Sequence, residues 1–159
     1  MRREPKRASL KVTARRVETE DEFREQPSER PVDAIPADES LKRVLLVEDD
    51  ELVAAGLAAL LEMEGMAVLV IGRGLPVVKA VESFQPEAVI LDLTLPDIGG
   101  IEVFRRLRGR WPQLPIVFST GHASSTKLSA ELSGDRVELL RKPYEIDELL
   151  AALQRITAV

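Results

Sequence analysis

The chain has 159 residues, of which 45% are hydrophobic and 31% are charged, and its formal net charge is −5. This length predicts one packed domain or slightly more, and the acidic balance excludes a globally basic nucleic-acid coat. The sequence has no cysteine and one histidine, His122, which excludes disulfides, thiolate chemistry and multi-histidine metal sites. No apolar run reaches the roughly 18 residues of a membrane span, and no secretory signal is recognisable, so we expect a cytoplasmic protein without membrane contact.

Residues 1–40 differ from the rest of the chain in composition, and we predict that they form a disordered, charged extension. Residues 1–16 carry seven basic side chains against Glu4. Residues 17–40 carry nine acidic side chains against Arg24 and Arg30. A solvated leader or linker is the preferred interpretation of this extension, and a basic arm for an anionic partner is the alternative.

From Leu41 to Val159, short apolar runs alternate with longer amphipathic segments, which predicts a second, folded domain. The runs predicted as buried strands are 43–47, 66–71, 88–92, 115–120 and 137–140. The segments predicted as helices are 51–64, 75–84, 100–110, 124–133 and 145–158. Gly65, Gly109 and Gly134 are expected to mark helix ends. Five such units predict an α/β fold, a doubly wound parallel sheet with helices on both faces.

Acidic side chains follow the ends of two predicted strands. Glu48, Asp49 and Asp50 follow the first strand, and Asp92 ends the third. If these strands are neighbours, their carboxylates converge, and the repulsion between them favours a divalent cation with oxygen ligands, Mg²⁺ above all. The three charges of Glu48, Asp49 and Asp92 would be balanced by Mg²⁺ together with Lys142. Asp50 has an equally good explanation as the cap of the following helix.

Two further polar residues are predicted at the same edge of the sheet. Thr120 ends the fourth strand, and Lys142 follows the fifth. Asp92 beside a metal and an ammonium group is a plausible carboxylate nucleophile toward phosphorus. Lys142 would hold one phosphoryl oxygen, and the Thr120 hydroxyl would hydrogen-bond another. Each residue alone has an ordinary structural explanation, but their joint occurrence at four strand ends favours a functional site.

Four segments carry a resemblance to a known family: VLLVEDDE (44–51), VILDLTLPDIGGIEVFRRLR (89–108), PIVFSTGH (115–122) and LLRKPYEIDELLAAL (139–153). In this order and spacing they resemble the receiver, or CheY-like, domain of two-component response regulators, and the likeness covers residues 41–159. The resemblance implies the flavodoxin-like strand order 2-1-3-4-5 and phosphorylation of Asp92 by a histidine kinase or a histidine phosphotransfer protein.

The resemblance also implies roles for the residues around Asp92. Glu48 and Asp49 would hold Mg²⁺ together with Asp92 and the backbone carbonyl of Thr94. Thr120 matches the family's switch hydroxyl, and Lys142 matches its invariant lysine.

The sequence departs from the family pattern at two places. Leu139 stands where many receivers carry an aromatic side chain that swings inward on activation, so we do not expect aromatic-gated switching. The end of the fourth strand resembles a receiver subgroup that ends in Phe-Ala-Thr-Gly, often found as single-domain regulators or attached to hybrid kinases. A change of order in the loop after Gly121 is the expected replacement for the aromatic swing. We also hypothesise that Thr94 and His122 set the lifetime of the phosphoryl group.

We therefore predict a single-domain response regulator whose output passes through protein contacts with a downstream protein, with a possible phosphorylation-dependent homodimer. No DNA-binding domain is recognisable in residues 1–159. Beyond Mg²⁺-dependent self-phosphorylation and slow autodephosphorylation, no enzyme activity is expected. The alternatives are the receiver portion of a hybrid histidine kinase and a receiver-like interaction module that is not phosphorylated. A haloacid-dehalogenase type phosphatase is disfavoured because Thr94 stands where that chemistry needs a carboxylate.

Overall fold

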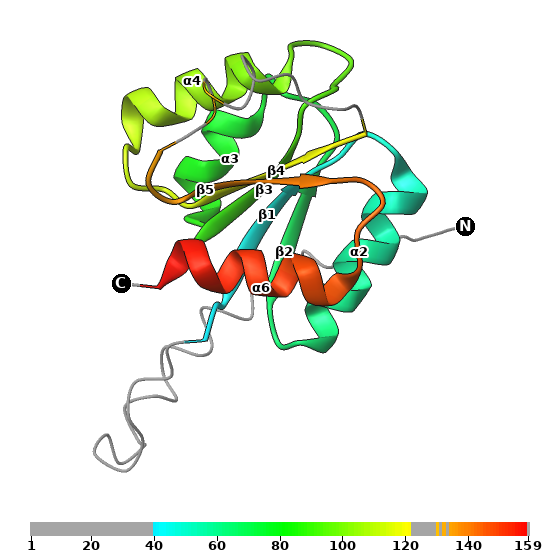
Figure 1. Ribbon diagram of the computed structural model, residues 1–159. Helices are drawn as coiled ribbons and strands as arrows, with labels where there is room; N and C mark the ends of the chain where they lie inside the picture. Colours follow the sequence, from blue (N-terminus) through cyan, green and yellow to red (C-terminus); the bar gives the residue numbers. More distant parts are fainter. Residues whose placement is uncertain (1–39, 122–129, 131, 133, 159) are drawn as a thin grey trace. The chain divides into compact units, whose positions relative to one another are not determined.

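The computed structural model describes residues 40–121, 130, 132 and 134–158 (Figure 1). The extension predicted for residues 1–40, apart from Ser40, and most of the helix predicted for 124–133 lie outside these residues. The described elements are β1 (Arg43–Val47), α2 (Glu51–Met63), β2 (Ala67–Ile71), α3 (Val77–Phe84), β3 (Ala88–Asp92), α4 (Gly100–Arg110), β4 (Ile116–Thr120), β5 (Val137–Arg141) and α6 (Ile146–Thr157).

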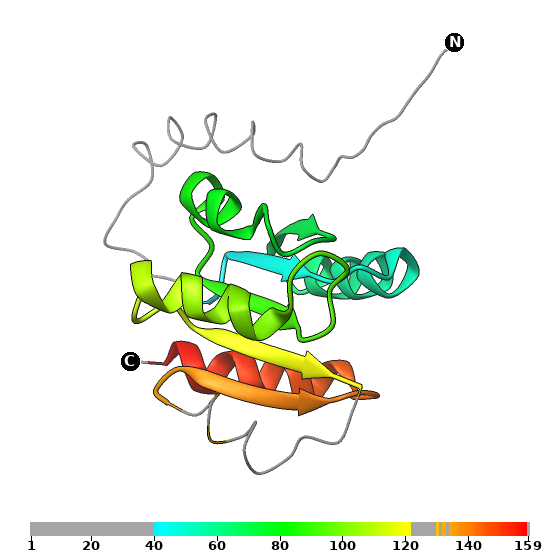
Figure 2. The same ribbon diagram turned by 90° about the horizontal axis from the view of Figure 1, so that it is seen from above.

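The strands form one parallel sheet in the order β2-β1-β3-β4-β5, which confirms the predicted α/β fold and strand order. Figure 2 shows the arrowheads of β1, β4 and β5 pointing the same way. Val47 of β1 pairs with Leu91 of β3, and Asp92 pairs with Ser119 of β4. Because of this register, the carboxyl ends of the three central strands meet at one edge of the sheet, where ligands bind in open α/β folds.

Successive strand residues point to opposite faces of the sheet, and each face has its own core. Leu45 and Leu91 pack on the face covered by α3 and α4, together with Phe118. Leu46 and Ile90 pack on the opposite face, which α2 and α6 cover (Figure 1). Strands buried on both faces need apolar residues at nearly every position, which explains the apolar runs 44–47 in β1, 88–91 in β3 and 116–118 in β4. Among the described helices, none combines the length and apolar character needed to cross a membrane.

The ends of the described helices agree with the predicted ranges to within two residues. The helix predicted for 100–110 is confirmed as α4. Gly109 lies one residue before its end at Arg110, and the Trp111 N–H donates to the carbonyl of Leu107. The helix predicted from residue 75 begins at Val77 instead. Leu75 precedes Pro76, the N-cap of α3, and the residue before a proline disfavours the helical conformation. The Leu75 N–H donates to the carboxylate of Asp97, 2.8 Å away.

Candidate functional site

The buried polar side chains mark one place in the fold. Among the described residues, the polar or charged ones classed as buried are Glu48, Asp92, Ser119 and Thr120. Glu48 directly follows β1, Asp92 ends β3, and Ser119 and Thr120 end β4. Burying a polar or charged group is costly unless it has a compensating partner, so their gathering at one sheet edge indicates a site with a function beyond packing.

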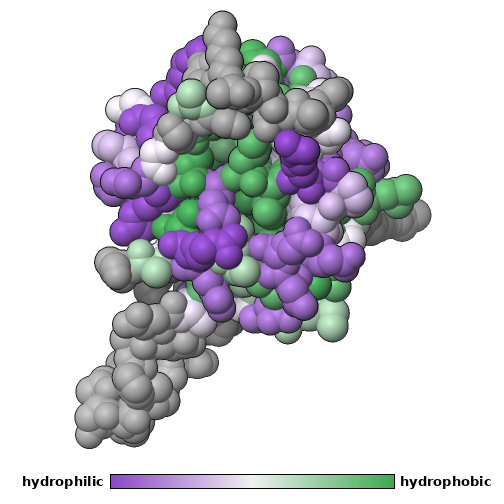
Figure 3. Space-filling view, in the orientation of Figure 1, coloured by the Kyte–Doolittle hydropathy of each residue, from purple (hydrophilic) through white to green (hydrophobic). Residues whose placement is uncertain are grey.

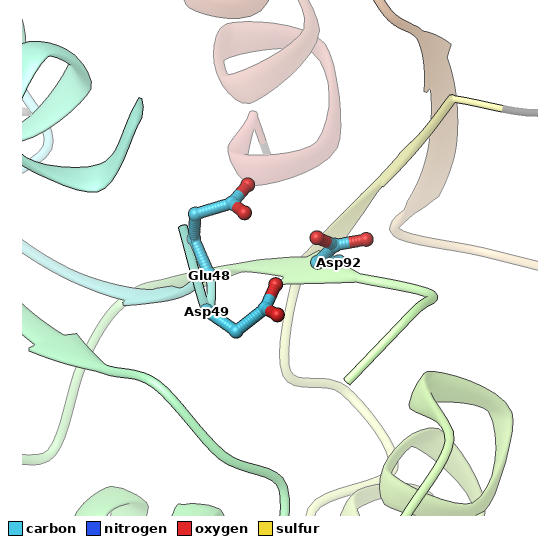
Figure 4. Close-up of side chains that lie close together, drawn as sticks. All are labelled: Glu48, Asp49 and Asp92. Atoms are coloured by element: carbon cyan, nitrogen blue, oxygen red, sulfur yellow. The ribbon is translucent and has the colours of Figure 1, made fainter. Parts of the chain in front are cut away.

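Glu48, Asp49 and Asp92 form an acidic cluster at this edge (Figure 4). Each offers one carboxylate oxygen, and these oxygens lie within 4.8 Å of one another. Glu48 and Asp92 are 5% exposed, whereas Asp49 is exposed. The structure therefore brings together the three carboxylates that the sequence placed at two neighbouring strand ends.

Asp50, the fourth acid of this stretch, faces the following helix instead. Its side chain accepts hydrogen bonds from the backbone N–H groups of Leu52 and Val53, both at 3.0 Å. It is the N-cap of α2, as one of its two sequence interpretations proposed. Its own N–H donates to Oε2 of Glu48 at 3.1 Å, and this bond helps to fix the Glu48 side chain.

Lys142 supplies the positive charge of the site. Its Nζ lies 3.0 Å from Oε1 of Glu48 and 3.4 Å from Oδ2 of Asp92. Desolvation acts to lower the pKa of Lys142, but the two carboxylates outweigh it and raise this pKa. Burial and the nearby charge of Asp92 raise the pKa of Glu48, against the opposing effect of Lys142. The ammonium group is thus held in its charged form between two buried carboxyl groups.

The segment after Asp92 is fixed closely against it. The Thr94 N–H donates to Oδ1 of Asp92 at 2.9 Å, and the Gly100 N–H donates to the carbonyl of Leu93 at 3.0 Å. A Cβ on Gly100 would lie 2.5 Å from the carbonyl oxygen of Asp92, so only glycine fits there. The hydrogen bond of Thr94 to Asp92 is made by its N–H, so the role of its carbonyl as a metal ligand stays a prediction.

Thr120 lies at the same edge on β4, next to the segment that carries Lys142. Its backbone carbonyl accepts a hydrogen bond from the Lys142 N–H at 2.7 Å, and its side chain is buried. Its neighbour Ser119 shares a side-chain hydrogen bond with Tyr144, and burial raises the pKa of that tyrosine. The end of β4 and the Lys142–Tyr144 segment are therefore joined by both backbone and side-chain bonds.

Two more residues were singled out in the sequence: Leu139 for the missing aromatic side chain, and His122 for the lifetime of the phosphoryl group. Leu139 is half-buried on β5, where it pairs with Phe118 and packs against the core shared with α3 and α4. His122 lies outside the described residues.

Two residues near the site were not singled out in the sequence. Asp97 accepts three backbone hydrogen bonds in the loops beside the acidic cluster, and Tyr144 bonds to Ser119. The Pro-Asp-Ile-Gly-Gly run is a turn signal that could have drawn attention to Asp97. Nothing in the local sequence indicates that Tyr144 reaches β4, because that contact depends on the β4–β5 pairing.

The donor set of the acidic cluster fits Mg²⁺. Three carboxylate oxygens within a few ångströms, on one exposed and two buried side chains, offer the oxygen ligands and solvent access that this ion prefers. Lys142 offsets only part of the negative charge.

A doubly wound parallel sheet in the order 2-1-3-4-5, with an acid–lysine cluster at its carboxyl edge, is the arrangement of a flavodoxin-like α/β domain. The family model of the response regulator receiver domain matches residues 44–154. The chain belongs to this receiver-domain family of two-component signalling proteins, as the resemblance indicated.

Relatives and solved structures agree with this assignment. The chain is 33% identical over 114 residues to the response regulator MprA of Mycobacterium tuberculosis, covering 72% of this chain and 50% of MprA. It is 36% identical over 115 residues to the transcriptional regulatory protein CreB of Escherichia coli, covering 71% of this chain and 49% of CreB. The chain thus spans about half the length of the curated relatives it matches.

Among solved structures, the receiver domain of RstA from Klebsiella pneumoniae, in a BeF3-activated state, is 31% identical with a TM-score of 0.68, over 74% of this chain and 100% of that one. The receiver domain of the sensor histidine kinase PA1611 from Pseudomonas aeruginosa is 25% identical with a TM-score of 0.67, over 76% of this chain and 100% of that one. That structure holds a magnesium ion coordinated in its active-site cleft.

Proposed function

We propose that residues 41–159 form a phosphorylated receiver that takes a phosphoryl group on Asp92 from a phosphohistidine, and that residues 1–40 are an extension to it. The observation that carries this proposal is the position of Lys142, whose Nζ lies 3.0 Å from a carboxylate oxygen of Glu48 and 3.4 Å from one of Asp92. The buried carboxylate of Asp92 lies beside this ammonium group and beside two further carboxylates. Such a carboxylate is suited to attack phosphorus, because the ammonium group can offset the charge of the phosphoryl group.

In the transfer, a carboxylate oxygen of Asp92 forms a bond to phosphorus while the P–N bond of the donor imidazole breaks, and the imidazole keeps the electron pair. Before transfer, Lys142 offsets the charge of Glu48 and Asp92. After transfer, the Asp92 carboxyl is an acyl phosphate, and Lys142 holds a phosphoryl oxygen as a point charge. The Thr120 hydroxyl donates to another phosphoryl oxygen.

Glu48, Asp49 and Asp92, with the carbonyl of Thr94, would hold Mg²⁺. When bound, the ion offsets the negative charge of the carboxylates and of the incoming phosphoryl group. The protein's part is to hold these oxygens in place, with Glu48 fixed by Lys142 and the Asp50 N–H, and Asp92 fixed by the Thr94 N–H.

The donor in this proposal is a histidine kinase or a histidine phosphotransfer protein, and the output passes through protein contacts, with homodimerisation as one possible form. The relatives named above include transcriptional regulators, and this chain covers about half of their length. Thr94 and His122 are proposed to influence how long the phosphoryl group persists.

The test is phosphorylation with phosphoramidate, read by intact mass, with and without Mg²⁺. The wild type is expected to gain one phosphoryl group only when Mg²⁺ is present, and Asp92→Asn is expected to gain none. Asp50→Asn is the matched control, because it removes a neighbouring acid yet keeps an oxygen that caps α2.

Failure of the wild type to gain a phosphoryl group, or equal gain in Asp92→Asn, would exclude this function. The receiver-like interaction module that is not phosphorylated would then be the better description.

A further inference from the structure

The carboxylate of Asp97 connects two loops that border the acidic cluster. Oδ1 accepts hydrogen bonds from the N–H groups of Gly74 at 2.7 Å and Ile98 at 2.8 Å, and Oδ2 accepts one from Leu75 at 2.8 Å. Desolvation acts to raise the pKa of Asp97, but the backbone N–H groups outweigh it and lower this pKa to about 2. The side chain thus accepts hydrogen bonds from three backbone donors in two separate segments.

The first of these segments, residues 72–76, links the acidic cluster to Asp97. At its start, the Glu48 N–H donates to the carbonyl of Ile71 at 3.0 Å, and a Cβ on Gly72 would lie 3.9 Å from the Cα of Asp49. In the middle of the segment, a Cβ on Gly74 would lie 2.7 Å from Cγ1 of Ile98. This segment therefore packs against the backbone of Glu48 and Asp49 on one side and the residue after Asp97 on the other.

The second segment, residues 93–99, follows Asp92 and contains Thr94. Its two ends are closed by the hydrogen bond from the Gly100 N–H to the carbonyl of Leu93 at 3.0 Å. Within the segment, Asp97 is the side chain that bonds to residues 74 and 75. Without the Asp97 carboxylate, the N–H groups of Gly74 and Leu75 lose the acceptor that connects them to this segment.

We propose that Asp97 is a positioning residue for the metal site. Its carboxylate holds residues 93–99, which follow Asp92, against residues 72–76, which pack against the backbone of Asp49. The metal ligands at the ends of β1 and β3 thereby keep one arrangement. This inference rests on the proposed Mg²⁺ site. Groups that orient metal ligands without touching the metal typically change metal affinity by about 10–100-fold when they are removed. We expect Asp97→Ala to weaken Mg²⁺ binding by about tenfold.

The chain provides a matched control in Glu87. Its carboxylate also accepts two backbone hydrogen bonds, from Lys42 at 2.6 Å and Arg43 at 3.2 Å. It directly precedes β3, at the opposite end of that strand from Asp92, about 15 Å away along five residues. Glu87→Ala thus removes a carboxylate that binds backbone amides but leaves the metal site alone.

The experiment measures Mg²⁺ binding to the full chain by isothermal titration calorimetry, and the Mg²⁺ concentration that gives half-maximal phosphorylation by phosphoramidate. We expect Asp97→Ala to raise the dissociation constant and the half-maximal concentration together, while the rate at saturating Mg²⁺ stays within about twofold of the wild type. Asp97→Asn keeps one acceptor oxygen, so its Mg²⁺ dissociation constant is expected to lie between those of the wild type and Asp97→Ala. Glu87→Ala is expected to bind Mg²⁺ as the wild type does.

Circular dichroism checks that each variant is folded. If Asp97→Ala does not fold, the test relies on Asp97→Asn. Unchanged Mg²⁺ affinity in both Asp97 variants would overturn the inference, and so would an equal loss in Glu87→Ala, which would indicate a general effect of stability. A wild type that neither binds Mg²⁺ nor is phosphorylated would instead remove the proposed function, and the inference with it.

Discussion

Asp49 is the exposed member of the acidic cluster, and its charge adds to those of the buried Glu48 and Asp92. Two like charges about 4 Å apart repel by about 1 kcal/mol even at the dielectric constant of water. We expect Asp49→Asn to raise the free energy of unfolding by about 1 kcal/mol in the absence of Mg²⁺, and to gain less stability than the wild type when Mg²⁺ is added. Urea denaturation followed by circular dichroism measures both effects.

Asp147→Asn is a suitable control for this prediction. It removes one acid from the first turn of α6, outside the cluster. Because an acid there interacts favourably with the helix dipole, its loss is expected to lower stability slightly and to leave the Mg²⁺ effect unchanged. If Asp49→Asn behaved in the same way, repulsion within the cluster would not limit stability.

Asp97 makes a pH-dependent contribution to stability. Its pKa is lowered from 3.8 to about 2, so its stabilising bonds are fully present above pH 3.8 and are lost as the pH falls through about 2. We expect Asp97→Asn to be less stable than the wild type at neutral pH, and the difference to narrow between these two values. Urea denaturation at several pH values tests this. A difference that does not vary with pH would mean that the charge of Asp97 is unimportant.

The site residues that could be predicted from the sequence are those at the carboxyl ends of neighbouring strands. Glu48, Asp49 and Asp92 directly follow or end strands recognisable by their apolar runs, so their proximity follows from the strand order. Asp97 could not be identified in this way, because its partners Gly74 and Leu75 are 22 or 23 positions away, in a loop of no regular structure. Asp97 can therefore be recognised only from its tertiary contacts.

At the scale of single elements, the glycines of two helices have opposite surroundings. A Cβ on Gly100, the first residue of α4, would lie 2.5 Å from the carbonyl oxygen of Asp92 and 2.7 Å from the Cα of Leu93. Gly56, inside α2, would meet nothing within 4 Å. We expect Gly100→Ala to destabilise the protein by about 1–3 kcal/mol through overpacking, and Gly56→Ala to stabilise it by about 0.5–1 kcal/mol.

Thermal or urea denaturation of the two variants gives the measurement, and each is the control for the other because the chemical change is identical. A loss of stability in Gly56→Ala, or a gain in Gly100→Ala, would contradict the contacts described here. Gly100→Ala is also expected to slow phosphorylation, because the displaced backbone belongs to Asp92 itself.

The central strands β1, β3 and β4 were predictable because burial on both faces imposes an apolar residue at almost every position. The starts and ends of the helices were harder to predict. The start of α3 follows Pro76, which disfavours the helical conformation at Leu75. The end of α4 depends on Trp111 and on Arg108, whose Nη1 donates to the Trp111 carbonyl at 3.1 Å, whereas Gly109 alone only weakens a helix.

At the scale of the whole molecule, α2 exposes several large apolar side chains. Leu52 and Met63 are 85% and 80% exposed, and apolar side chains reach the surface beside α2 in the view of Figure 3. Surface positions away from special contacts tolerate substitution within about 0.5 kcal/mol. We expect the double variant Leu52→Gln, Met63→Gln to keep its stability while eluting earlier from a hydrophobic interaction column. Leu61→Ala is the contrast, because this side chain is fully buried and its loss is expected to cost about 2–5 kcal/mol.

A double variant that lost several kcal/mol would show that α2 packs against something that the described residues do not include. Unchanged retention on the column would mean that these side chains do not govern how the surface meets an apolar phase.

The single tryptophan of the chain has a consequence for spectroscopy. Trp111 follows the last residue of α4, whereas Gly100 at the other end of that helix touches the backbone of Asp92. Eleven helical residues span about 16 Å, so the indole is too remote for a bound ion to quench it directly. The indole packs against the core on the face of α3 and α4, and the guanidinium of Arg110 lies over the ring, 4.8 Å from its centroid. Any change of tryptophan emission on phosphorylation would therefore report a movement transmitted along α4, and a silent signal would show that this helix stays rigid.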